Sequence, residues 1–200
     1  MRVFVAGASG VLGVRLVPLL VDAGHVVAGM TRTPAKLDLL RDLGAMPVCC
    51  DVFDADELER AVRNFGPEGV IHQLTDLPDD VAHIERSLAG NARIREVGTD
   101  NLVRAARAAG AERLVAQSIA WTINGIRPPS VDQLERATLD AGGVVVRYGQ
   151  WYGPGTYHPN DVPPSLHVHI DTAARHTVAA LDLAPGIYVA TDDGLTVAGS

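Results

Sequence analysis

The sequence predicts an α/β fold, a doubly wound parallel sheet with helices on both faces. Short apolar runs alternate with helical patterns along the 200 residues. A glycine-rich turn, Gly-x-x-Gly-x-x-Gly, joins the first apolar run to the first helical pattern. Glycine also follows each of the early helical patterns, as it commonly does just past a helix C-terminus. Strands that alternate with helices favour a parallel sheet buried on both faces.

Each element follows from this alternation. The expected strands are 2–6, 25–30, 46–50, 69–73, 113–118, 144–148 and 186–190. The expected helices are 11–23, 34–43, 54–65, 92–109 and 131–141, and the glycines expected at their ends are Gly24, Gly44, Gly66, Gly110 and Gly142. Asp54 followed by Glu57 is typical of a helix N-cap with a reciprocal acid. Residues 1–200 are expected to form a single domain, with 153–166 as an irregular loop on the substrate side.

Composition excludes several classes of protein. The net charge is −7 and no basic block interrupts it, so a nucleic-acid partner is not expected. The two cysteines, Cys49 and Cys50, are adjacent and poorly placed to pair, which fits a reducing, cytoplasmic location. No apolar run reaches the length of a membrane span, and residues 1–30 lack the layout of a signal peptide.

The N-terminal turn is the strongest functional motif. Gly7, Gly10 and Gly13 lie between a predicted buried strand and a helix start. Such a turn directs backbone N–H groups outward at the positive end of a helix, which suits a diphosphate. The strand–turn–helix context predicts a dinucleotide site.

The end of the second expected strand bears on which dinucleotide binds. An acid that would bind the ribose hydroxyls of NAD is absent there, and Arg32 stands in its place with Lys36 behind it. A guanidinium pairs bidentately with phosphate, so NADP is the expected cofactor and NAD the alternative. The competing interpretation of Arg32 is a solvated charge at a helix start.

Polar residues follow the next two strands as well. Asp51 could accept from the adenine amino group with Val52 packed on the ring, or Asp51 could cap a helix. After the fourth strand, Gln73 to Thr75 should run beside the ribose and the diphosphate. His72 is expected as a hydrogen-bonded core residue rather than a catalytic base.

Three potential metal ligands share one register near the C-terminus. His167, His169 and Asp171 would face one side of an extended run. The rest of a metal site is missing, so structural roles are favoured and no metal is expected.

A set of motifs in order along the chain resembles the extended and atypical short-chain dehydrogenases/reductases, the NAD(P)-dependent epimerase/dehydratase-like group. The matching pieces are Gly7-Ala-Ser-Gly-Val-Leu-Gly13, Asp51-Val52, Val70-Ile-His-Gln73, Gly98-Thr-Asp-Asn-Leu102, Leu114-Val-Ala-Gln-Ser118, Arg147-Tyr-Gly-Gln-Trp-Tyr-Gly-Pro154 and Val168-His-Ile-Asp-Thr-Ala-Ala174. The resemblance implies a Rossmann fold, here with little or no separate substrate domain.

The resemblance also implies roles for individual residues. Those expected to bind the cofactor are Gly7, Ser9, Gly10, Val11, Leu12 and Gly13 at the diphosphate, Thr31 and Arg32 near the 2′-phosphate, Asp51 and Val52 at the adenine, and Gln73, Leu74 and Thr75 at the ribose side. Ser118 matches the active-site serine that hydrogen-bonds the substrate oxygen. The segment from Tyr148 to Tyr152 matches the part that lines the nicotinamide.

The chain departs from the family at the catalytic tyrosine and lysine. Residues 122–136 contain neither, and Lys36 is the single lysine of the chain. The remaining proton donors, in order of preference, are Tyr152, Tyr148 and Tyr157, although core packing or a place at the pocket wall is the competing interpretation for each. Arg147 should face away from Tyr148, because adjacent strand residues point to opposite sides.

Three functions follow. The first is an NADP-dependent oxidoreductase acting on a small carbonyl/alcohol substrate. The alternative is a non-catalytic NAD(P)-binding sensor or partner-binding module, resembling NmrA-like regulators. The third is an NAD(P)-dependent epimerase or dehydratase, which needs the same missing pair. A homodimer through the helices at 92–109 and 131–141 is suggested by resemblance alone, and ordinary core packing is the competing interpretation of their apolar faces.

Overall fold

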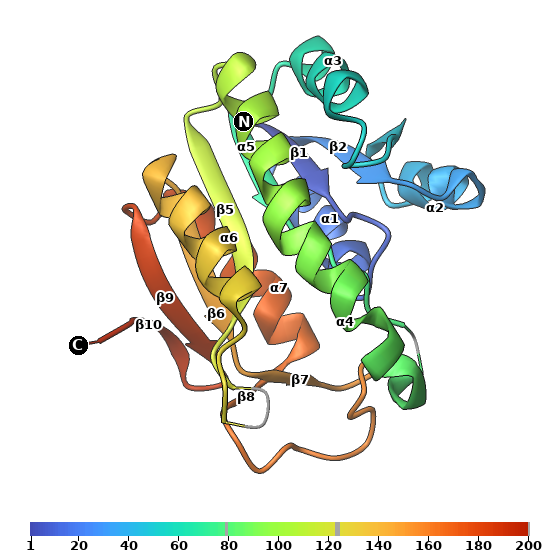
Figure 1. Ribbon diagram of the computed structural model, residues 1–200. Helices are drawn as coiled ribbons and strands as arrows, with labels where there is room; N and C mark the ends of the chain where they lie inside the picture. The colour runs from blue at the N-terminus through green and yellow to red at the C-terminus, as the bar shows by residue number, and fades with distance from the viewer. Residues whose placement is uncertain (79, 123–124, 200) are drawn as a thin grey trace.

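A computed structural model describes residues 1–78, 80–122 and 125–199 and shows one central sheet (Figure 1). The strand order is β10-β9-β6-β5-β4-β1-β2-β3. Strand bounds are β1 Arg2–Ala6, β2 Val26–Thr31, β3 Met46–Cys49, β4 Gly69–His72, β5 Arg113–Ile119, β6 Val144–Tyr148, β9 Gly186–Thr191 and β10 Gly194–Val197. Neighbouring strands are parallel except β10, which pairs antiparallel with β9. The predicted doubly wound α/β fold is confirmed, with β10 as an unpredicted edge strand.

Helices cover both faces of this sheet, as Figure 1 shows. Their bounds are α1 Gly13–Asp22, α2 Leu37–Asp42, α3 Ala55–Phe65, α4 Ile84–Arg93, α5 Thr99–Ala108, α6 Pro129–Asp140 and α7 Ile170–Ala179. Residues alternate between two cores along β1. Val3 and Val5 join the core beneath α1 and α7, whereas Phe4 and Ala6 join the core beneath α3 and α5. A strand buried on both faces explains why 2–6 is a continuous apolar run.

Two helical regions differ from the expectation. The helix expected at 92–109 begins earlier, at Ile84, and α4 and α5 are joined by a π-helical turn, η3 (Ile94–Gly98). Helix α7 was not predicted, because its buried face includes Ala173, Ala174 and Thr177 and gives only a weak apolar pattern. Short 3₁₀ turns lie at η1 (Pro34–Lys36), η2 (Val81–His83) and η4 (Ala180–Asp182).

The predicted helix ends are confirmed. The five glycines named for this role all have a positive φ, between 63° and 89°. The N-cap of α3 is also confirmed, because an Asp54 carboxylate oxygen accepts from the Glu57 N–H at 2.9 Å. The Asp54 N–H donates to the Asp51 carbonyl rather than to Glu57.

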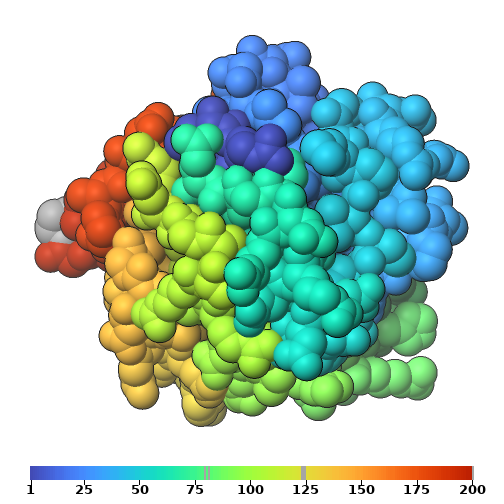
Figure 2. Space-filling view, turned by 90° about the horizontal axis from the view of Figure 1, so that it is seen from above, coloured from blue at the N-terminus to red at the C-terminus, as the bar shows by residue number. Residues whose placement is uncertain are grey.

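A second, two-stranded sheet lies beyond the carboxyl end of β6. β7 (Gln150–Tyr152) pairs in parallel with β8 (His167–His169), and residues 153–166 between them carry no helix or strand. From above, the C-terminal strands and the region around α2 and α3 occupy opposite sides of the molecule (Figure 2). Within the described ranges, none of the helices is long and apolar enough to cross a membrane.

Candidate functional site

The glycine turn is built by close backbone approach. Gly7 has φ +91°, and a Cβ there would lie 2.6 Å from the Gln73 carbonyl oxygen. A Cβ on Gly13 would lie 2.4 Å from the Gly7 carbonyl oxygen. The N–H groups of Gly7 and Ala8 both donate to the Met30 carbonyl. Those of Val11, Leu12 and Gly13 have no backbone acceptor among the described residues. The turn is therefore a cradle with free donors at the start of α1, which fits an anionic ligand.

Side chains after β2 close one side of this cradle. The Ser9 hydroxyl donates to Thr31 Oγ1 at 2.8 Å, and Lys36 Nζ lies 3.5 Å from the Ser9 carbonyl oxygen. The Arg32 guanidinium is 58% exposed and pairs with Asp76 at 2.5 Å. Asp76 follows β4 and was not among the predicted site residues. A ligand phosphate at Arg32 would therefore compete with a carboxylate that is already in place.

The residues after β3 form the neighbouring wall. An Asp51 carboxylate oxygen accepts from the Phe53 N–H at 2.9 Å, so Asp51 closes a turn and stays exposed. Val52 is buried, and its carbonyl accepts from Asn101 Nδ2 at 2.9 Å. Gly98 lets the π-helical turn approach Val52, since a Cβ there would lie 3.3 Å from its side chain.

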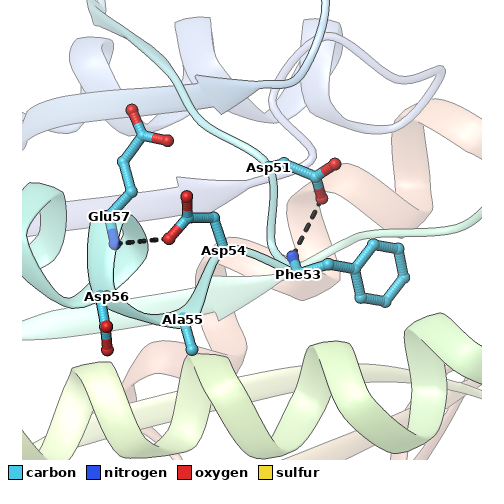
Figure 3. Close-up of a pocket in the computed structure, with 6 residues that line it drawn as sticks. All are labelled: Asp51, Phe53, Asp54, Ala55, Asp56 and Glu57. Atoms are coloured by element: carbon cyan, nitrogen blue, oxygen red, sulfur yellow. Dashed lines mark hydrogen bonds between the residues drawn. The ribbon is translucent and has the colours of Figure 1, made fainter.

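An open hollow of about 530 Å³ lies outside this wall (Figure 3). Its lining residues are Asp51, Phe53, Asp54, Ala55, Asp56 and Glu57. Two of the carboxylates are held by backbone N–H groups, as the dashed lines in Figure 3 show. The four carboxylates of the lining make this hollow negative, which disfavours a phosphate here. The basic side chains near the cradle, Arg32 and Lys36, are the better position for a phosphate.

The end of β4 runs beneath the cradle. His72 is buried, its Nδ1 accepts from the Leu74 N–H, and its Nε2 lies 3.0 Å from Thr99 Oγ1. Burial, assisted by the charge of Arg95, lowers the pKa of His72 to about 4. The histidine is therefore neutral, with its proton on Nε2, in keeping with a core residue.

Gln73, Leu74 and Thr75 continue along the same edge. Gln73 is only 6% exposed, and neither atom of its amide group makes a hydrogen bond of normal geometry among the described residues, although the amide lies close enough to the Tyr148 hydroxyl to lower its pKa against the larger effect of burial. Leu74 is half-buried and Thr75 is exposed. Buried amides are rarely left without partners, so Gln73 has unused hydrogen-bonding capacity next to the cradle.

Ser118 belongs to a buried ionic cluster that the sequence did not reveal. Its hydroxyl donates to Glu135 Oε1 at 2.5 Å. Arg147 donates to both oxygens of Glu135, at 2.9 and 2.6 Å, and Arg127 donates to Oε1 as well. Burial would raise the pKa of Glu135, but the hydrogen bonds from Arg147 and Ser118 and the charge of Arg127 outweigh burial and lower the pKa.

The three tyrosines considered as proton donors are all engaged elsewhere. Tyr148 is fully buried on the α7 side of the sheet, where its hydroxyl lies 2.7 Å from Thr177 Oγ1. Burial raises its pKa to about 12. The Tyr152 hydroxyl donates to Asp192 at 2.7 Å, and that bond raises its pKa. The Tyr157 hydroxyl donates to the Pro78 carbonyl. For each tyrosine, the geometry favours the competing interpretation, a packing or anchoring role, over the role of proton donor.

The histidine pair near the C-terminus surrounds Tyr152. The rings of His167 and His169 meet the Tyr152 ring edge-on, with centroids 5.7 and 5.1 Å away. Asp171 instead pairs with Arg15 at 2.9 Å. Within the described ranges, no group of three or more His, Cys, Asp or Glu residues could hold a metal ion.

The irregular segment 153–166 is anchored beside the glycine turn and beside the loop after β4. Arg15 on α1 donates to the Pro154 carbonyl at 2.6 Å, and Gly155 lies against Val11 of the turn. The Tyr157 bond to Pro78 fixes the other side. The segment therefore bridges the glycine turn and the loop after β4.

Sequence reasoning missed four charged residues near the site, namely Glu135, Arg127, Arg95 and Asp76. One indication was available: Arg147 interrupts the apolar strand 144–148, and a cation there needs a buried carboxylate. Nothing in the spacing identified Glu135 as that carboxylate.

Comparison with known proteins gives a consistent result. The NAD(P)H-binding family matches residues 7–142. A 3-diazoavenalumate denitrifying reductase from a Streptomyces species is 37% identical over 241 aligned residues, which cover 96% of this chain and 76% of the relative. A photosystem II assembly factor of Synechocystis is 30% identical and shares 92% of this chain but 59% of its own length.

Solved structures share the fold. A UDP-glucose 4-epimerase of Thermus thermophilus in complex with NAD superimposes with a TM-score of 0.78 at 23% identity, over 98% of this chain and 79% of that chain. A UDP-glucose 4-epimerase of Thermotoga maritima with UDP-glucose gives a TM-score of 0.80 at 17% identity, with the same coverage. At these identities the likeness concerns the fold.

Proposed function

This chain belongs to the NAD(P)H-binding family, and we propose that it is an NADP-dependent oxidoreductase acting on a small carbonyl/alcohol substrate. The observation that carries the proposal is the glycine cradle with its free N–H donors beside Arg32 and Lys36. Membership in this family supports the binding of a nucleotide cofactor. A relative that is named as a reductase and aligns with 96% of this chain supports redox chemistry.

The residues around the cradle fit such a cofactor. The N–H groups of Val11, Leu12 and Gly13 would hold the diphosphate, and Arg32 with Lys36 would hold the 2′-phosphate. Val52 and the Asp51 turn would border the adenine. When bound, the nicotinamide ring supplies or accepts the hydride. Segment 153–166 would keep water from the covered part of the cleft.

The Ser118 hydroxyl remains our candidate for contacting the substrate oxygen. In the structure its proton is directed at Glu135. Donation to a substrate would therefore require an exchange of partners. Tyr152 holds its proton firmly because of Asp192, so it is a weak acid at neutral pH.

Turnover tests the proposal directly. We expect the protein to oxidise NADPH in the presence of an aldehyde or ketone panel, and Ser118→Ala to lower kcat/KM by about two orders of magnitude, as expected for loss of an oxyanion-type donor. Tyr188→Phe, far from the cradle and bonded to the Ala184 carbonyl, is the matched hydroxyl-removal control. NADPH binding without turnover of any member of the panel would count against an enzyme.

Cofactor preference is a separate prediction. Arg32→Ala should weaken NADPH binding about ten- to a hundredfold, the usual range for a hydrogen bond to a charged group, and leave NADH binding nearly unchanged. Calorimetric titration of both cofactors measures the difference. Arg41→Ala is the control, since Arg41 is an exposed cation paired with Asp38 on α2. Equal losses for NADPH and NADH in Arg32→Ala would exclude the phosphate assignment.

A non-catalytic NAD(P)-binding module is the second candidate. It is favoured by the engaged hydroxyls of Ser118, Tyr148 and Tyr152 and by the absence of a second lysine from the chain. One relative is named as an assembly factor. Co-purification of a stoichiometric partner that dissociates on addition of NADPH would favour this candidate over the enzyme.

A further inference from the structure

Arg95 is a partly buried cation whose guanidinium group has no partner within the described ranges. It lies in the π-helical turn η3, between α4 and α5. The Arg95 guanidinium has no hydrogen bond to another described residue and no described carboxylate within ion-pair distance, and the nearby carboxylates pair with Arg127 and Arg147 instead. Partly buried guanidinium groups normally have an anionic or carbonyl partner, because desolvating an unpaired charge is costly.

Its surroundings place Arg95 near the carboxyl ends of β4 and β5. η3 packs against α6, and Figure 1 shows α6 beside the α4–α5 arm. Burial lowers the pKa of Arg95, and the positive charge of Arg127 lowers it further. The turn that carries Arg95 is followed directly by Thr99, whose Oγ1 lies 3.0 Å from Nε2 of His72, the last residue of β4. The charge of Arg95 in turn lowers the pKa of His72. Arg127 also reaches the Ile119 carbonyl at the end of β5. Ligands of doubly wound folds bind beyond this edge.

Among the described residues, Arg95 and the charged side chains around Glu135 together carry a surplus of one positive charge. Arg95, Arg127 and Arg147 supply the cations, and Asp132 and Glu135 supply the anions. Glu135 is shared between Arg127 and Arg147, and Asp132 pairs with Arg127. His72 is neutral, so it neither adds to nor removes the surplus. Arg95 is the one of these three arginines that has no anionic partner in the part of the chain that the structure describes.

We propose that Arg95 binds a carboxylate of the substrate, so that this protein acts on carbonyl compounds that carry an acid group. The planar guanidinium fork matches a carboxylate bidentately, and a single surplus charge matches a monoanion better than a phosphate dianion. The inference rests on the proposed function, because it names the substrate class of the same site.

Binding of a matched acid and ester tests the proposal without turnover. The probes are para-formylbenzoate, its methyl ester, and phenyl phosphate, each titrated into the protein with and without NADP. The acid should bind at least about tenfold more tightly than the ester, as a charge-assisted bidentate pair predicts. Arg95→Gln should abolish this preference, Arg95→Lys should retain part of it, and Arg136→Gln, an exposed arginine on α6, should leave it intact.

The acid–ester comparison on the unaltered protein keeps the proposal falsifiable even if Arg95→Gln does not fold. Equal binding of acid and ester, or an acid preference that survives in folded Arg95→Gln, would overturn it. Tighter binding of phenyl phosphate than of the acid would overturn the monoanion assignment. Failure of NADP to bind would instead contradict the proposed function, and the titrations without cofactor separate the two failures.

Discussion

Replacing Gly7 by alanine is expected to weaken NADPH binding about a hundredfold or more and to destabilise the fold. The added Cβ would meet the Gln73 carbonyl oxygen at 2.6 Å, at a position with φ +91°. A left-handed backbone costs an ordinary residue about 1–2 kcal/mol, and overpacking adds about 1–3 kcal/mol. Displacement of the turn would also remove charge-assisted bonds to the diphosphate, and two of these are worth about 3 kcal/mol or more. Calorimetry and urea unfolding measure the two effects.

Gly24→Ala is the matched control for this prediction. Gly24 has φ +81°, but a Cβ there would meet nothing within 4 Å. The Gly24→Ala variant therefore has the free-energy cost of a left-handed backbone but no steric clash, and its affinity for NADPH should be unchanged. If Gly7→Ala bound NADPH as Gly24→Ala does, the glycine cradle would not be the diphosphate site.

Replacing Glu135 by glutamine is expected to lower the free energy of unfolding by about 3 kcal/mol, because removal of one partner leaves buried charges without compensation. The glutamate is only 6% exposed in its side chain, and its partners Arg127 and Arg147 are about a quarter exposed. Glutamine keeps the size of the side chain but removes its charge. Urea unfolding at neutral pH measures the loss.

Asp132→Asn provides the control, since Asp132 is a half-exposed partner of Arg127 and its loss should cost at most about 1 kcal/mol. Similar losses of unfolding free energy in Asp132→Asn and Glu135→Gln would mean that burial does not strengthen the ion pairs of Glu135.

The same carboxylate predicts a dependence on pH. Hydrogen bonds and arginine charges lower the pKa of Glu135 below its value in the unfolded chain. The stabilisation is therefore fully present above the unfolded pKa of about 4.3 and is lost as pH falls through the folded pKa. The difference in unfolding free energy between the natural chain and Glu135→Gln should accordingly shrink in acid. A difference that stays constant through this range would exclude ionised Glu135 as the source.

The sequence by itself determined the layered fold and the glycine turn that we propose as the nucleotide cradle. Both depend on local chemistry: the apolar run of β1, the glycines that permit the turn, and the glycines that end the helices. Residues 7, 13, 31 and 73 converge because parallel strands share one carboxyl edge, a consequence of topology that alternation already predicts.

Tertiary structure alone decided which charged groups meet. Ser118 and Glu135 are seventeen positions apart, and Arg32 and Asp76 are forty-four apart. No local spacing links the members of these pairs, because they lie on different elements whose crossing fixes the contact. That Arg95 has no ion pair among the described residues likewise follows only from the placement of the carboxylates around it. Local periodicity therefore specifies the scaffold, whereas the electrostatics of the site depends on long-range packing.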